Sequence, residues 1–383
     1  MREALALADN ALYTATPNPR VGCVVVKDGI VIGTGWTQPY GGWHAEQHAL
    51  SRCSVDAAGA TAYVTLEPCN HVGASGRKES CVESLLRAKV ARVVVAAIDP
   101  NPKMGGKSLE MLREKGVAVV AGLLDDEARE QNVGFISRMT RGRPWVRVKM
   151  AASLDGRTAL ADGTSQWITG AEARADGHAW RARACAVLTG VGTVMQDDPA
   201  LTVRAVETPR QPRRIVVDRH AQTAATAKVF AGPEAVWVFA SEAPRAPFPS
   251  NVETIVLRDA NGRVDLAALL EELGRRKINE LHVEAGAKLS GAFLALGLVD
   301  ELLLYFAPSL LGDTARGMFA LPVLESLEAR IRLDIREITR LGDDWRVLAR
   351  VQTVIQLGKQ EKARRLRGKI RWEGDLDEMR TDK

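Results

Sequence analysis

The segment His44–Cys69 reads HAEQHALSRCSVDAAGATAYVTLEPC, and it joins a helical pattern to an apolar strand that ends near a cysteine. HAEQHAL predicts a short helix and TAYVTL predicts a strand. A second cysteine, Cys81, follows a polar, glycine-containing loop and opens another amphipathic stretch, CVESLLRAKV. Cys69 and Cys81 fit a disulfide, a metal site or coincidence, and the rest of the chain has to decide between these interpretations.

The length of 383 residues suggests two domains, each large enough for its own hydrophobic core. No apolar run approaches the roughly 20 residues of a membrane span, and the first residues do not resemble a signal peptide. We therefore expect a cytoplasmic protein with no membrane partner. A disulfide framework is not expected in that compartment, which favours a metal site over a disulfide. The cysteines are Cys23, Cys53, Cys69, Cys81 and Cys185.

The sequence carries 52 basic and 47 acidic side chains, a net charge of +5. Residues 353–383 contain nine basic and six acidic side chains and therefore hold +3 of that total. The rest of the chain is nearly neutral, which argues against a nucleic-acid-binding face.

Residues 1–140 alternate helical and strand patterns, which predicts an α/β sheet covered on both faces. One helix is expected over DDEAREQNVGFI, residues 125–136. The polar stretch TRGRP, Thr140–Pro144, marks the predicted domain boundary, and a second α/β domain is expected over residues 141–351. Residues 352–383 form a charged tail that we expect to be extended or helical.

One histidine, two cysteines and one glutamate form the candidate site of the first domain. His44 and Glu46 stand two residues apart, and Pro68, Cys69 and Cys81 follow. Zn²⁺ bound by one imidazole and two thiolates keeps a fourth position for water and lowers the pKa of that water. A carboxylate that is not a ligand must carry protons to the leaving amine, and Glu46 is placed for this task. The order H-x-E…P-C is typical of zinc nucleobase deaminases, but here eleven residues instead of two precede the second cysteine.

The other cysteines and histidines have plainer interpretations. Cys23 lies in an apolar strand and is predicted to be a core residue, while Cys53 and Cys185 have no partner motif. His48 is predicted to pack or to support the ligands instead of binding the metal. His71 lies in the loop and could contact either substrate or solvent.

Four motifs of this domain, TPNPRVGCVVV, HAEQHAL, AYVTLEPCNH and DPNP, together resemble the deaminase half of the bifunctional riboflavin-biosynthesis deaminase/reductase family. The resemblance implies a cytidine-deaminase-like fold of three layers. It identifies Asn18 as a substrate contact, and it places Arg77 or Lys78, in the loop between the cysteines, near the substrate phosphate. That loop is longer than is common in the family, and the sequence before the first helix is shorter.

The second domain lacks G-x-G-x-x-G, but two glycine-containing stretches, TGVGTVMQDDPALTVR and VEAGAKLSGAFL, follow apolar strands. Such glycines are often simple turns, although each stretch could aim backbone N–H groups or a helix N-terminus at a phosphate. With KMAASLDGRTAL, SQWITG, HVEAG and DELLLYFAPSLLG, they resemble the reductase half of the same family, whose fold is similar to dihydrofolate reductase. The resemblance implies zinc and NADPH as cofactors.

The resemblance also implies which residues line the reductase site. The NADPH contacts carried over by position are Ala152, Trp167, Thr193, Asp197, Gly286, Ala287, Lys288, Leu289, Ser290, Gly291 and Ala292. The contacts to the ribose phosphate substrate are Lys149, Ser165, Arg181, Leu201, Arg204 and Glu284. Arg181 and Arg204 could bind a phosphate dianion bidentately. Hydride delivery depends mainly on positioning, because the cofactor carries the chemistry; Lys149 or Asp155 could assist proton delivery or be structural.

Arg219 departs from the family pattern, because a small hydroxyl residue often follows VVD near the cofactor. An arginine at this position could pair with a cofactor phosphate or displace part of the site.

The family normally ends near WRVLARV, and the tail is similar instead to the C-terminal half of antitoxins of the virulence-associated toxin–antitoxin class. The string LRGKIRWEGDLDEMR, with Trp372 among alternating charges, carries this resemblance. It implies a fused segment that binds a PIN-domain ribonuclease toxin, with Trp372 as the anchor. A frameshift product, a cloning or assembly join and a disordered charged tail are the alternatives.

Together these features predict a bifunctional enzyme with a deaminase domain at residues 1–140 and a reductase domain at residues 141–351. The expected reactions are hydrolytic deamination of a diaminopyrimidinone ribosylamino phosphate, followed by NADPH-dependent reduction of the ribose to a ribityl chain. We expect small-molecule substrates and a homo-oligomer. The alternatives are a deaminase acting on another pyrimidine or on nucleic acid, and a toxin-binding module on a catalytically idle scaffold.

Overall fold

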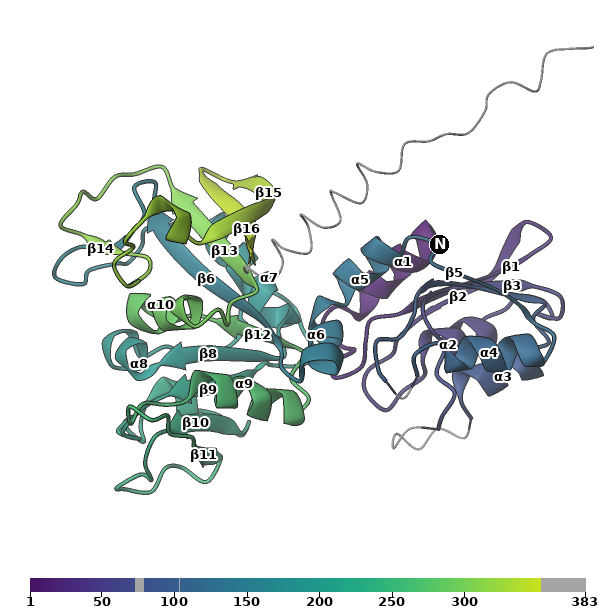
Figure 1. Ribbon diagram of the computed structural model, residues 1–383, viewed down its shortest axis with the longest axis horizontal. Helices are drawn as coiled ribbons and strands as arrows, with labels where there is room; N and C mark the ends of the chain where they lie inside the picture. The colour runs from purple at the N-terminus through teal and green to yellow at the C-terminus, as the bar shows by residue number, and fades with distance from the viewer. Residues whose placement is uncertain (73–78, 103, 353–383) are drawn as a thin grey trace, which may run out of the picture.

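The computed structural model describes residues 1–72, 79–102 and 104–352, and it contains two large β-sheets (Figure 1). One sheet lies wholly within residues 22–121 and the other within residues 145–352. No helix in these described ranges is both long enough and apolar enough to cross a membrane. The tail, with Trp372, and the loop residues Arg77 and Lys78 lie outside the described part of the chain.

The first sheet is the middle of three layers and has the strand order β2-β1-β3-β4-β5. Strand β1 pairs antiparallel with β2 and β3, whereas β3, β4 and β5 run parallel. Figure 1 shows α1 and α5 on one face of this sheet and α2, α3 and α4 on the other, which confirms the expected three-layer arrangement. The bounds are α1 (Arg2–Ala8), η1 (Asp9–Ala11), β1 (Gly22–Lys27), β2 (Ile30–Trp36), α2 (Ala45–Ser51), β3 (Thr61–Leu66), α3 (Cys81–Arg87), β4 (Arg92–Ala97), α4 (Lys107–Glu114), β5 (Ala118–Ala121) and α5 (Asp125–Gln131).

The second sheet has nine strands in the order β11-β10-β9-β8-β12-β6-β13-β16-β15. All its pairings are parallel except those of β16 with β13 and β15. The bounds are α6 (Val133–Arg141), β6 (Trp145–Ser153), β7 (Arg157–Ala159), α7 (Ala171–Arg183), β8 (Ala186–Gly190), α8 (Val191–Asp197), β9 (Arg213–Val217), η2 (Lys228–Phe230), β10 (Val236–Ala240), β11 (Val252–Val256), α9 (Leu266–Arg275), β12 (Glu280–Val283), α10 (Ala287–Ala295), β13 (Glu301–Ala307), β14 (Arg316–Gly317), η3 (Leu327–Ala329), β15 (Arg332–Leu341) and β16 (Asp344–Gln352).

The single helix expected over residues 125–136 is wrong, because the chain breaks into α5 and α6 at Asn132. The Asn132 side chain accepts a hydrogen bond from Arg20 N and donates one to Arg20 O, both at 2.8 Å. These bonds hold the residue at φ −118°, outside helical geometry. Helix α6 then continues to Arg141 and ends at Gly142 in the left-handed conformation. The predicted division between residues 140 and 141 therefore falls within the last turn of α6.

A buried ion network holds β6, β12 and β13 together under the Trp180 ring. The Arg147 side chain, 2% exposed, donates to Glu301 at 2.6 Å and to Glu280 at 3.0 Å. Arg183 donates to both oxygens of Glu280, at 3.1 and 3.2 Å. Burial alone would raise the pKa of Glu280, but the charges of Arg183 and Arg147 outweigh burial and hold that pKa well below its usual range.

We expect Glu280→Gln to lower the free energy of unfolding by about 3 kcal/mol at pH 7, because Arg183 loses its paired carboxylate and Arg147 keeps only Glu301 among the described residues. The pKa of Glu280 is depressed in the folded state, so its contribution is complete above the unfolded value of about 4.3 and declines as the pH falls further. The difference between wild type and variant should therefore narrow in acid. Urea unfolding between pH 3 and pH 7 measures both effects.

The matched control is Asp334→Asn, which breaks an ion pair with Arg336 whose two side chains are 41% and 46% exposed. This change should cost less than about 1 kcal/mol. Equal losses in the two variants would contradict a structural role for the Glu280 network.

Candidate active sites

Helix α2 brings His44 and Glu46 close to the first sheet. It packs against β2 over two glycines, Gly33 and Gly35. A Cβ atom added to Gly35 would lie 2.3 Å from the backbone nitrogen of Ala49, so no side chain fits there. The helix begins immediately after His44, and Glu46 stands in its first turn with only 3% of its surface exposed.

Two further segments bring the cysteines to the same place. Cys69 follows β3, and Cys81 is the first residue of α3. A capping box fixes this helix start: the Ser80 hydroxyl accepts from Glu83 N at 3.2 Å, and the Glu83 carboxylate accepts from Ser80 N at 2.7 Å. The backbone N–H of Cys81 also points at the Cys69 sulfur, at 3.5 Å.

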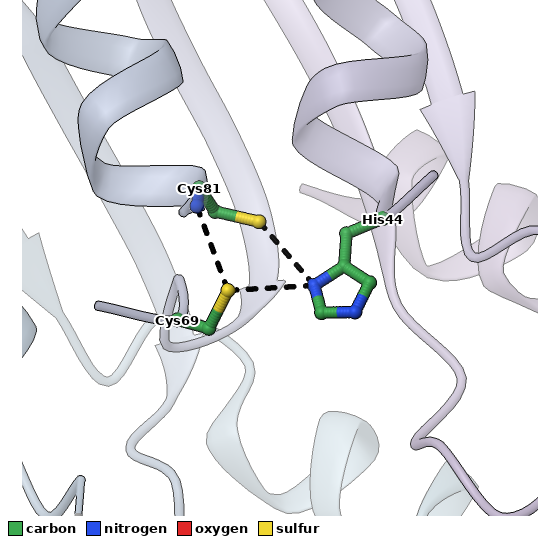
Figure 2. Close-up of side chains that lie close together, drawn as sticks. All are labelled: His44, Cys69 and Cys81. Atoms are coloured by element: carbon green, nitrogen blue, oxygen red, sulfur yellow. Dashed lines mark hydrogen bonds between the residues drawn. The ribbon is translucent and has the colours of Figure 1, made fainter. Parts of the chain in front are cut away.

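The three predicted ligands converge, as Figure 2 shows. His44 Nδ1 lies 3.5 Å from Cys69 Sγ and 3.4 Å from Cys81 Sγ, and all three ligand atoms lie within 4.8 Å of one another. Zn–S bonds of about 2.3 Å and a Zn–N bond of about 2.0 Å at tetrahedral angles would separate nitrogen from sulfur by about 3.5 Å. The donor set and its spacing therefore fit Zn²⁺.

Glu46 lies beside this cluster without belonging to it, since its Oε2 accepts a hydrogen bond from Cys81 Sγ at 3.2 Å. Burial raises the pKa of Glu46, although the charge of His44 opposes this. Burial also raises the pKa of Cys81, while hydrogen bonding from the Cys81 thiol lowers the pKa of Cys69. A bound cation would favour the thiolate form of both cysteines.

A pocket of about 310 Å³ opens onto the cluster. Asn18 and His71 line it together with the metal-side residues, and their contact with substrate stays a prediction. Sequence reasoning assigned no role to Glu67 and Asp99, which also line it. The Glu67 carboxylate accepts backbone N–H bonds from Asp99 at 3.2 Å, Gly106 at 2.9 Å and Ser108 at 3.1 Å, so it fixes the loop after β4. Burial raises the pKa of Asp99 to about 6.

The remaining thiols and His48 lie apart from the metal cluster. Cys23 is fully buried in the first hydrophobic core, and all five cysteines are free thiols. The His48 ring packs edge-on against Trp36, with its Nδ1 2.9 Å from Gln38 Nε2. A groove of about 770 Å³ along α5 and α6 is larger than the pocket at the cluster, but none of the predicted site residues lines it.

The two glycine-containing stretches of the second domain both form helix starts. Helices α8 and α10 begin directly after Gly190 and Gly286, and each follows a parallel strand. The two starts are neighbours, because a Cβ on Gly286 would lie 3.9 Å from Thr193 Oγ1 and one on Gly190 would lie 3.2 Å from Leu289 Cδ2. Free N–H groups at neighbouring helix starts can bind phosphate.

The segment that carries Ser165 and Trp167 also reaches α8, since Gln196 Nε2 donates to Gly163 O at 2.9 Å. Trp167 is 71% exposed and is covered on one side by the Arg174 guanidinium, 4.7 Å from the ring centroid. Asp197 is exposed at the end of α8, and Ala152 is buried in β6. The predicted cofactor residues therefore lie along α8, along α10 with the glycine before it, on β6 and on the segment tied to α8.

Arg181 is already paired within the protein. Its Nε and Nη2 donate to the two oxygens of Glu284 at 2.7 and 2.8 Å, and its Nη1 donates to Thr202 O at 2.6 Å. Bidentate phosphate binding by Arg181 would require this pair to open. Arg204 is exposed, and the one side-chain bond recorded for it within the described ranges is to Thr202 Oγ1 at 3.3 Å. Arg204 therefore suits a phosphate better than Arg181.

Lys149 and Asp155 differ sharply in their surroundings. Lys149 is half-buried over the Tyr305 ring, and burial lowers its pKa, which suits a proton donor. Asp155 accepts from Ser153 Oγ and from the backbone nitrogen atoms of Leu311 and Gly312, so its carboxylate holds a turn.

His178 lies beside Arg204, and Arg219 follows β9. His178, which sequence reasoning missed, accepts a hydrogen bond from Arg204 N at 3.3 Å, and burial lowers its pKa to about 4. Arg219 is exposed beyond the end of β9, and its carbonyl accepts from the Ser241 hydroxyl at 2.9 Å.

Residues 1–97 match the family described as the cytidine and deoxycytidylate deaminase zinc-binding region, and residues 144–347 match the RibD C-terminal domain. The chain is 44% identical to the riboflavin biosynthesis protein RibD of Escherichia coli K12, over 90% of this chain and 96% of that protein. Among solved structures, Acinetobacter baumannii RibD aligns with a TM-score of 0.84 at 40% identity, covering 92% of this chain and 98% of that one.

A second solved structure extends the comparison to a more distant organism. The diaminohydroxyphosphoribosylaminopyrimidine deaminase/5-amino-6-(5-phosphoribosylamino)uracil reductase of Thermotoga maritima aligns with a TM-score of 0.83 at 32% identity, covering 92% and 97% of the two chains. Both halves of this chain are therefore similar to corresponding halves of the same proteins.

The capping box gives a testable link between helix start and metal binding. Ser80→Ala should lower the free energy of unfolding by about 1 kcal/mol, because it removes the N-cap of α3. It should also speed zinc loss to a chelator, since Cys81 is the residue that the cap positions. Asp265→Ala is the matched control: it removes the N-cap of α9, where Asp265 accepts from Ala267 N and Ala268 N. Equal zinc retention in the two variants would contradict the link.

Proposed function

This chain belongs to the RibD family of riboflavin-biosynthesis proteins, and we propose which of its residues carry out each of two reactions. The protein is a bifunctional deaminase and reductase. The first reaction is hydrolytic deamination of 2,5-diamino-6-(5-phosphoribosylamino)pyrimidin-4(3H)-one. The second is NADPH-dependent reduction of the ribosyl side chain of 5-amino-6-(5-phosphoribosylamino)uracil to ribityl. The observation that carries the proposal is the convergence of one imidazole and two thiolates beside the buried Glu46.

His44, Cys69 and Cys81 hold the zinc ion of the deaminase. When bound, the metal supplies Lewis acidity and makes water a good nucleophile near neutral pH. Glu46 takes a proton from the attacking water and delivers it to the leaving amine. Its burial excludes bulk water, and its raised pKa suits a group that must both accept and release a proton. Asn18 orients the pyrimidine from the wall of the same pocket.

The reductase site lies along the helix starts of the second domain. NADPH supplies the reducing equivalent, and the N-termini of α8 and α10 hold its phosphates. Arg204 binds the substrate phosphate, while Arg181 positions Glu284 through the bidentate pair. Lys149, half-buried with a lowered pKa, supplies the proton that accompanies reduction at the sugar.

We propose a deaminase domain at residues 1–140 and a reductase domain at residues 141–351, acting in a homo-oligomer in the cytoplasm. Five free thiols suit such a reducing compartment. Binding of a PIN-domain toxin through Trp372 stays a prediction, because the tail lies outside the described residues.

Glu46→Gln tests the proton carrier. The glutamine is nearly isosteric, so the variant should keep about one zinc per chain yet lose at least about 100-fold in deamination rate, the usual scale of general acid–base catalysis. Reduction of the aminouracil supplied directly should continue. Metal analysis and product masses provide the readouts, and substantial remaining deamination would refute the role of Glu46.

Arg204→Ala tests the phosphate contact of the reductase. Loss of a charge-assisted hydrogen bond of about 1.5–3 kcal/mol should raise KM for reduction at least about tenfold. Deamination should proceed normally, because Arg204 is outside the residues that line the deaminase pocket. Separate assays on the two substrates decide the matter, and a parallel fall in both activities would argue for one shared site.

A further inference from the structure

Two basic side chains from outside the first sheet line the deaminase pocket. Arg138 belongs to α6, which lies between the two sheets in Figure 1, and Lys277 belongs to the turn between α9 and β12 of the second sheet. Both line the same cavity as His44, Glu46 and Cys69. The second domain therefore contributes part of the wall of the first domain's pocket.

Neither cation is neutralised by a carboxylate among the described residues. Arg138 donates through Nε to Asn279 Oδ1 at 2.6 Å and through Nη2 to Pro17 O at 3.3 Å, and both acceptors are uncharged. The ammonium of Lys277 has no hydrogen bond or ion pair recorded in the described ranges. The pocket carboxylate Glu67 is occupied by three backbone N–H groups and is no partner for either cation. The cavity is also lined by Glu46, Glu67 and Asp99, but no ion pair joins either cation to them, and two unpaired cations favour an anionic group of the ligand.

Lys277 stands in a backbone conformation that favours glycine. Its φ is +65°, and it follows the C-cap of α9. The hydrogen bonds Lys277 N to Gly274 O and Ile278 N to Leu273 O form a Schellman motif. Glycine is the usual residue at this position, because any other side chain carries a steric cost. The lysine is thus present where local structure alone would favour its replacement by glycine.

Asn279 fixes these groups relative to the pocket. Its Oδ1 accepts from Arg138, and its Nδ2 donates to Pro17 O at 3.1 Å, beside the predicted substrate contact Asn18. The two parts approach closely there: a Cβ on Gly134 of α6 would lie 2.8 Å from Asn279 O. The turn that carries Lys277 is therefore anchored two residues away by buried contacts to both sides of the interface.

We propose that Lys277, with Arg138 beside it, binds the phosphate monoester of the deaminase substrate, so that the reductase domain supplies a specificity determinant of the deamination step. The inference rests on the proposed function, whose substrate carries a ribosyl phosphate. A dianionic phosphate accepts charge-assisted bonds from ammonium and guanidinium groups, and both are present without carboxylate partners. Asn279 is a positioning residue, because it acts through Arg138 and Pro17.

The test is Lys277→Gly in the full-length, zinc-loaded protein, assayed for deamination of the phosphorylated substrate and of its dephosphorylated nucleoside. Glycine suits the conformation at this position, so the variant should melt at or above the wild-type temperature. We expect KM for the phosphorylated substrate to rise about tenfold, with little change for the nucleoside. The preference for the phosphorylated form should therefore fall about tenfold.

Lys89→Gly is the matched control. Lys89 has φ +52° after α3 and makes the same pair of bonds, Lys89 N to Leu86 O and Val90 N to Leu85 O, but it is not among the residues lining the pocket. Lys89→Gly should have a similar effect on the melting temperature and keep the wild-type preference for the phosphorylated substrate.

The outcomes separate the alternatives. The proposal would be overturned if Lys277→Gly and Lys89→Gly showed the same preference for the phosphorylated substrate over the nucleoside. It would also be overturned if Lys277→Gly lost the same fraction of deaminase activity on both substrates, because that result indicates a purely structural role. If the wild-type protein deaminates neither substrate, the proposed function itself fails, and this inference fails with it.

Discussion

The sulfur atoms of Cys69 and Cys81 lie 3.5 and 3.4 Å from the Nδ1 atom of His44, as a shared metal ion requires. The three residues come from separate segments, and the elements of the first α/β part hold these segments together. As thiolates, the buried Cys81 and the half-buried Cys69 would repel each other and the buried Glu46 carboxylate until a cation joins them. The protein meets the requirement with rigid parts. Glycines in β2 let α2 lie close to the sheet, and a capping box fixes the residue at which α3 begins. The packing of α2 therefore fixes the position of His44, and the capping of α3 fixes the position of Cys81.

The second constraint is the contact between the two parts of the chain. A single buried amide, Asn279, forms hydrogen bonds to an arginine of α6 and to the carbonyl that precedes Asn18. The ion network of Arg147, Glu280 and Glu301 lies immediately beyond it, so the strand that follows Asn279 is itself firmly held. Displacement of β12 would therefore be transmitted to the wall of the deaminase pocket. The two halves have separate sheets, and β12 is one of their connections; Thr16 also contacts Cys185, and Arg210 donates to Tyr13 O.

The sequence predicted the metal cluster well because motif order maps directly onto element ends: a helix start, a strand end and a second helix start. It did not predict the break at Asn132, because the amphipathic pattern continues across it and only a tertiary bond to Arg20 interrupts the helix. The family resemblance implies that Arg181 contacts the substrate, and this assignment stays a prediction; residue type alone does not show that the guanidinium also pairs with Glu284. Lys277 and Arg138 were missed because their place in the pocket exists only after the two parts have packed.

A single electrostatic distinction orders the basic residues of both sites. Arg181 and Arg147 each donate hydrogen bonds to a carboxylate, so both guanidinium groups form ion pairs within the protein. Arg204, Arg138 and Lys277 contact only neutral acceptors or none within the described ranges. Arg204 and Lys277 are exposed, so water solvates their charges, whereas Arg138 is partly buried and burial lowers its pKa. The pairing state of each cation, which no motif encodes, therefore distinguishes Arg147 and Arg181 from the cations that have no carboxylate partner among the described residues.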